Sequence, residues 1–139
     1  AMSWFYSAPA GVRRYLKHIT QVLFPSIPDI VVSEFGFAEP FEGQWSNLNS
    51  ELWALKRADY FQQYLDNILL SIHEDGVNVT GAWGWSILDN FEWALGTSVR
   101  FGVQYVNYTS LERTPKASLF QFLNWFKEHE AGGNATMRM

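Results

Sequence analysis

The sequence predicts an α/β fold in which short, buried, parallel strands alternate with amphipathic helices. Three segments carry apolar residues at helical spacing, and two shorter runs are apolar without polar alternation, which is typical of strands in a parallel sheet. The segments are arranged in the order helix, strand, helix, strand, helix. Because two strands cannot form a stable sheet alone, either partner strands lie outside these 139 residues or the fold is unusual.

The first helix is predicted from Pro9 to Phe24. Its apolar residues recur at helical spacing: Val12, Tyr15, Leu16, Ile19 and Leu23. The segment from Pro25 to Pro28 then breaks the helix. The β-branched run at 30–33 is predicted to be a buried strand, which leads directly into Glu34.

A loop is expected at 36–50, where Gly, Pro, Asn and Ser are frequent, and a long helix at 51–73. Gly76 suits the end of that helix, because glycine adopts the left-handed conformation there at little cost. The second buried strand is predicted at 77–85.

The C-terminal third is predicted to hold a loop at 89–100 and one or two short strands at 101–108. A last helix is expected to begin at Thr114-Pro115, with threonine as N-cap and proline in the first turn. Its buried face is expected to contain Leu119, Phe122, Leu123 and Phe126. The Gly-rich segment 130–139 is expected to be a disordered tail.

Composition argues against several classes of function. The net charge is −4 and the basic residues are scattered, so we expect no nucleic-acid partner. No apolar run reaches membrane-spanning length, no signal peptide is visible, and the compartment stays open. No metal-ligand spacing is present. Aromatic residues make up 17% of the chain, with seven Trp, which suits either an aromatic core or a sugar-binding surface.

Polar and aromatic side chains lie at the ends of both predicted strands. Glu34 ends the first strand, where a carboxylate is either exposed at a functional site or held in an ion pair. After the second strand, residues 83–93 contain three indoles, two carboxylates and an asparagine. This stretch is either a tryptophan-rich core loop or an aromatic platform with acceptors for sugar hydroxyl groups.

The second predicted strand and the segment after it resemble the C-terminal end of glycoside hydrolase family 1, the β-glucosidase family. The resemblance rests on the order and spacing of several motifs: Trp85 to Gly96, Arg100 to Val103, Tyr105-Val106, Arg113 to Lys116, and Asp75 to Gly81. Ser33-Glu34-Phe35-Gly36 stands where the family usually reads Thr-Glu-Asn-Gly. The resemblance implies the last two strands and their helices of a (β/α)₈ TIM barrel that hydrolyses β-glycosides with retention.

The resemblance also implies roles for individual residues. Glu34 would be the nucleophile, and four residues would bind the substrate: Trp85 as platform, Glu92 and Trp93 as hydrogen-bonding groups, and Phe101 as a wall near C6. Asp89 and Asn90 are expected to hold the loop rather than touch substrate. The implied partners are a small β-glycoside and the remainder of the barrel, and no cofactor is needed.

A retaining glycosidase needs a second carboxyl group about 5–5.5 Å from the nucleophile as acid and base. The family carries it in an Asn-Glu-Pro sequence on the fourth strand, which this chain lacks. Glu39, in Ala38-Glu39-Pro40, is interpreted as a decoy, and Glu42 as a loop or leaving-group-side residue. We therefore expect the isolated chain to be inactive. A non-catalytic sugar-binding piece and a barrel-completing piece remain the alternatives.

Overall fold

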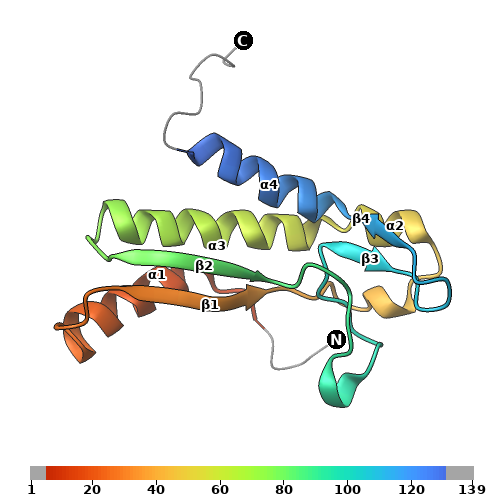
Figure 1. The fold of residues 1–139 in the computed structure, drawn as a ribbon, viewed down its shortest axis with the longest axis horizontal. Coiled ribbons are helices and arrows are strands. Elements are labelled where there is room, and N and C mark those ends of the chain that lie inside the picture. The colour runs from red at the N-terminus through yellow and green to blue at the C-terminus, as the bar shows by residue number, and fades with distance from the viewer. Residues whose placement is uncertain (1–5, 131–139) are drawn as a thin grey trace, which may run out of the picture.

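The structure, a computed structural model, describes residues 6–130, and all but the first residue of the predicted tail at 130–139 lies outside this range. None of its helices is long and apolar enough to cross a membrane. Along the chain, its elements are α1 (Pro9–His18), the π-helical turn η1 (Ile19–Leu23), β1 (Ile30–Gly36), the 3₁₀ turn η2 (Glu42–Gln44), α2 (Leu48–Leu52), α3 (Leu55–His73), β2 (Val79–Trp85), the 3₁₀ turn η3 (Trp93–Leu95), β3 (Gln104–Val106), β4 (Arg113–Pro115) and α4 (Ala117–His129) (Figure 1).

The central unit is β1–α3–β2, in which two parallel strands are joined through one long helix. Ile30 pairs with Val79 at one end of the sheet, and Gly36 pairs with Trp85 at the other. Helix α3 packs against both α1 and α4 and runs alongside the strands (Figure 1). Because parallel strands need a long crossover connection, this arrangement confirms the predicted α/β order.

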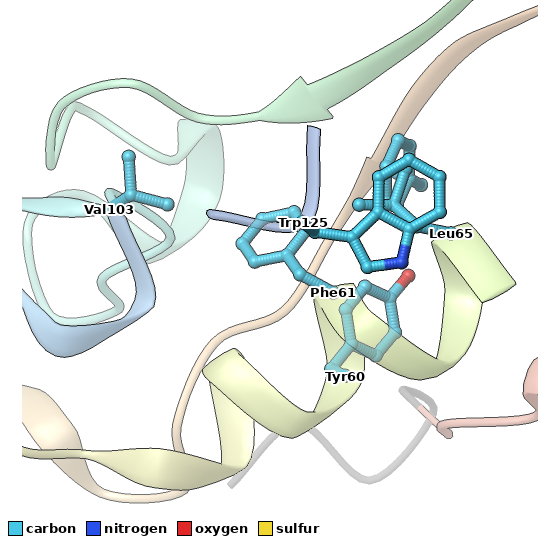
Figure 2. Close-up of a cluster of buried hydrophobic side chains, with 6 residues drawn as sticks. Tyr60, Phe61, Leu65, Val103 and Trp125 are labelled. Atoms are coloured by element: carbon cyan, nitrogen blue, oxygen red, sulfur yellow. The ribbon is translucent and has the colours of Figure 1, made fainter. Parts of the chain in front are cut away.

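The core is aromatic and centres on Phe61 of α3, which is 1% exposed. Its ring makes edge-to-face contacts with Phe35, Tyr60 and Phe122, with centroids 5.6, 5.8 and 5.1 Å away. Leu65, Val103 and Trp125 complete the buried cluster (Figure 2). Phe35, which is next to Glu34 in the chain, therefore anchors the end of β1 to the helical layer.

One face of the sheet is not covered by residues 6–130. Val31 and Trp83 are 46% and 63% exposed, so the prediction that both faces are buried is wrong for the part of the chain described. Of the predicted buried face of α4, Leu123 and Phe126 are 46% and 40% exposed. These side chains are apolar but lack covering elements, which agrees with partner strands outside this chain.

Two predicted helix boundaries are wrong. Thr114 and Pro115 do not begin a helix but pair with Tyr105 and Gln104 in the β3–β4 sheet, and α4 begins at Ala117. The tertiary pairing overrides a local sequence signal. The predicted helix at 51–73 is divided, because α2 ends at Leu52 within the predicted span and α3 begins at Leu55. Gly76, in contrast, has the predicted left-handed conformation, with φ of 68°.

Asp75 links the turn after α3 to α1. Its carboxylate accepts hydrogen bonds from Arg13 Nε at 2.6 Å and Lys17 Nζ at 3.0 Å, which lower its pKa from 3.8 to about 2. Since the pKa is lower in the folded state, this pairing stabilises the fold above pH ~4 and is lost as the pH falls toward 2.

We therefore expect Asp75→Asn to lower the Tm at pH 7 and to lose its effect as the pH approaches 2. Thermal unfolding of wild type and variant across this pH range tests the expectation. Asp29→Asn, which removes an exposed carboxylate outside this cluster, is the matched control. A Tm difference for Asp75→Asn that did not vary with pH would contradict the assignment.

Candidate active site

The ends of β1 and β2 meet closely at one edge of the sheet. Gly36 pairs with Trp85, and a Cβ atom on Gly36 would clash with the Trp85 carbonyl oxygen. Glycine is therefore required for the two backbones to approach at this point. The pairing register shifts between Val32 and Phe35, the segment that contains Glu34. The parallel arrangement thus brings Glu34 and Trp85 to the same end of the sheet.

The five residues predicted to form a site share one cavity. An open cavity of about 890 Å³ is lined by residues that include Glu34, Trp85, Glu92, Trp93 and Phe101. It continues along β1 to α1 and to tyrosines of α3. The sequence separates Glu34 from Glu92 by 58 positions, yet both line this one cavity in the fold. Glu34 and Glu92 are the carboxylates that line this cavity in the described part of the chain.

Polar and aromatic groups in the cavity differ in how firmly they are held. Trp85 Nε1 donates a hydrogen bond to Glu92 Oε1 at 3.2 Å, so the indole fixes this carboxylate. Trp93 is 83% exposed and has a positive φ of 48°, which is unusual for a bulky residue and orients its indole away from the core. Phe101 is buried and forms part of the wall. Exposed indole faces suit the C–H faces of sugar rings.

The loop after β2 is closed at its base by hydrogen bonds. Ser86 and Val103 pair through Val103 N to Ser86 O at 2.8 Å, and Asp89 N donates to Gln104 O at 3.1 Å. The Asp89 carboxylate also accepts from the backbone N–H of Gly102 at 3.0 Å. The prediction that Asp89 holds the loop is confirmed, and residues 92–93 lie at the tip of a tethered segment. The Trp85–Ser86 peptide bond at its entrance is cis.

A buried cluster of charged side chains lies beneath the two loops, and it was not predicted from the sequence. It joins three carboxylates to three cations: Glu42, Glu51, Asp89, Arg57, Arg100 and Lys116. Each is at most 8% exposed. The sequence feature that could have predicted this cluster is Arg57, a charged residue that precedes Phe61 by one turn and hence shares the buried face of α3.

Glu42 does not take the predicted place on the leaving-group side. Its side chain is completely buried, where it pairs with Arg57 and accepts from Lys116 Nζ at 2.6 Å. Of the two roles predicted for Glu42, the loop position is confirmed, whereas the leaving-group side is excluded because η2 directs this carboxylate inward. Arg57 also donates to the Phe37 and Arg100 carbonyl oxygens at 2.8 Å each. Both loops are thereby attached to α3.

Glu39 has a structural role, in agreement with its interpretation as a decoy. It is 6% exposed, and its Oε1 accepts a hydrogen bond from the backbone N–H of Arg57 at 2.7 Å. The residue before α3, Ala54, provides no side-chain cap, so Glu39 satisfies one of the first N–H groups of this helix. Burial raises the pKa of Glu39 above its ordinary value.

Residues 6–130 contain no group of acidic or His side chains that could hold a metal ion.

Comparison with known proteins agrees with this geometry. The profile described as glycosyl hydrolase family 1 matches residues 1–131. Beta-glucosidase 42 of Arabidopsis thaliana is 38% identical over 131 residues, which cover 94% of this chain and 26% of that protein. Beta-glucosidase 1B of Phanerodontia chrysosporium is 40% identical over 129 residues, covering 93% of this chain and 23% of its own.

Solved structures show the same relation. Beta-glucosidase 2 from Trichoderma reesei, in complex with Tris, superposes with a TM-score of 0.86 at 35% identity, over 92% of this chain and 27% of that one. A family 1 β-glucosidase from Humicola insolens, in complex with glucose, has a TM-score of 0.85 at 35% identity, over 90% of this chain and 26% of that one. The fold is therefore part of a (β/α)₈ barrel, as predicted, and the chain spans about a quarter of the length of these relatives.

Proposed function

The chain belongs to glycosyl hydrolase family 1, and from this premise we propose that it supplies the nucleophile and one sugar-binding wall of a retaining β-glucosidase site. The remaining wall, with the acid/base carboxyl group, comes from barrel strands outside these residues. We call this chain together with those strands the complete barrel. The observation that carries the proposal is the single cavity shared by Glu34, Trp85, Glu92, Trp93 and Phe101.

In this mechanism, the ionised Glu34 carboxylate attacks the anomeric carbon while the aglycone oxygen receives a proton from the second carboxyl group. A covalent glycosyl-enzyme forms, and water then releases the sugar with its β configuration retained. The exposure of Glu34 at the cavity supports this role, because a nucleophile has to reach its substrate.

The other four residues bind the sugar. Trp85 provides a hydrophobic face for the ring, Glu92 accepts hydrogen bonds from sugar hydroxyl groups at C4 and C6, Trp93 donates to the neighbouring hydroxyl, and Phe101 closes the wall near C6. The hydrogen bond from Trp85 to Glu92 supports a preset position for the carboxylate. The glucose bound by the Humicola insolens relative supports a glucosyl residue as the unit recognised.

The test is covalent trapping in the complete barrel with 2,4-dinitrophenyl 2-deoxy-2-fluoro-β-glucoside. Fluorine at C2 destabilises both transition states, while the activated leaving group lets the first step proceed, so the glycosyl-enzyme accumulates. Digestion and mass spectrometry should find the fluoroglucosyl group on Glu34. Proton NMR of products from an ordinary β-glucoside should show the β anomer first.

The isolated 139-residue chain is the control for this experiment. We expect it to release no p-nitrophenol from an aryl β-glucoside, since it lacks the Asn-Glu-Pro strand end that carries the acid/base in the family, and Glu92 is assigned to the sugar hydroxyl groups. Labelling of another residue, or initial release of the α anomer, would contradict the proposed nucleophile and mechanism. Activity of the isolated chain would contradict the division of the site.

A further inference from the structure

Lys116 lies between the two loops that carry the proposed site, although it is not one of the residues that line the cavity. It comes immediately after β4 and is 0% exposed. Its ammonium donates to Glu42 Oε1 at 2.6 Å and to Asp89 Oδ1 at 2.9 Å. Glu42 belongs to the loop after β1, eight residues beyond Glu34, and Asp89 precedes Glu92 by three residues. One side chain therefore bridges the nucleophile loop and the sugar-binding loop.

The bridge is separable from the other ion pairs of the cluster. Glu42 is also paired with Arg57, and Asp89 Oδ2 accepts from Arg100 Nη1 at 2.7 Å. Without the Lys116 ammonium, each carboxylate would keep one cationic partner within its own part of the cluster. The direct ionic connection between Glu42 and Asp89 would be lost.

Stability alone is a poor explanation for this ammonium. Burying a charged group carries a desolvation penalty that the paired charges recover only in part, and apolar residues of similar size often replace buried ions at no net cost. Burial accordingly lowers the pKa of Lys116 below its ordinary value. The specific gain is a fixed separation between two loops, because a charged hydrogen bond to each carboxylate restricts both distance and direction.

We propose that Lys116 is a positioning residue that fixes the Glu92–Trp93 loop relative to the strand end at Glu34. The role rests on the proposed function, since positioning is useful only if both loops contact one sugar. A displacement near 1 Å at such a site costs about 10²-fold in rate. Contacts made by Glu92 would be affected most, because this residue lies only three positions from the bridged Asp89.

The test compares Lys116→Met with Lys127→Met in the complete barrel. Lys127 is an exposed residue of α4, so its variant controls for the loss of one positive charge. The value of kcat/KM is measured for p-nitrophenyl β-glucoside and for its 6-deoxy analogue, which lacks one hydroxyl group that Glu92 would accept from. Amide hydrogen exchange of residues 86–103 reports the position and mobility of the loop.

We expect Lys116→Met to lower kcat/KM for the glucoside by about tenfold or more and to lower that for the 6-deoxy analogue less, so that discrimination between them decreases. Exchange in residues 86–103 should become faster than in Lys127→Met. A merely structural role would lower both rates by one common factor. That result, or unchanged exchange, would overturn the inference. If the wild-type barrel hydrolysed neither substrate, the proposed function would fail, while hydrogen exchange would still decide whether Lys116 fixes the loop.

Discussion

Replacing Glu34 with glycine in the complete barrel should lower kcat for aryl β-glucosides by about 10³-fold or more, with the folded structure retained. The loss arises because no glycosyl-enzyme can form without the carboxylate. Glu34 is exposed, so its removal leaves no buried cavity or unpaired buried group. Initial rates together with thermal unfolding separate this chemical loss from a loss of stability.

Azide should restore turnover to Glu34→Gly when the leaving group is 2,4-dinitrophenolate. The small anion occupies the space of the missing carboxylate and attacks the anomeric carbon from that face. The C–N bond forms as the C–O bond to the phenolate breaks, so the product is the α-glucosyl azide. Glu39→Gln is the matched control, since Glu39 caps α3, and it should lose less than about tenfold. If azide instead restored turnover to the Glu39 variant, Glu39 rather than Glu34 would be identified as the nucleophile.

Replacing Arg57 with methionine should lower the free energy of unfolding by about 3–5 kcal/mol. Arg57 is 0% exposed, and the loss would leave the buried carboxylates in excess over the buried cations. Two carbonyl oxygens, of Phe37 and Arg100, would also lose their donor. Both effects act in the same direction, because each removes a partner that Arg57 supplies to a buried or partly buried group.

Chemical denaturation of the complete barrel measures this change. Arg14→Met, on the exposed side of α1, removes an equal charge and should change the free energy of unfolding by less than about 0.5 kcal/mol. Adding Glu42→Gln to Arg57→Met should recover part of the lost stability, because it removes the excess negative charge. A loss below about 1 kcal/mol for Arg57→Met would contradict this expectation and show that the buried cluster tolerates one excess negative charge.

Local patterns in the sequence determined much of this protein. The β-branched run before Glu34 and the apolar stripe around Phe61 correctly predicted a strand and a helix, because β-branched residues favour extended backbone and the helical period shows which face of a helix is buried. Gly76 correctly marked the turn after α3, because its conformation is set by the residue itself. The five residues of the proposed site were predicted from the family resemblance, and the structure places them around one cavity.

Tertiary structure alone decided how distant segments meet. Thr114-Pro115 reads locally as a helix start, yet pairing with β3 makes it a strand. Glu42 reads as a polar loop residue, yet burial beside Arg57 and Lys116 makes it an internal anchor. A charge is stable in the interior only when partners from other segments surround it, and no local pattern encodes those partners. The sequence thus predicted the groups that we propose to act on a glycoside, whereas the fold determined which contacts hold them in place.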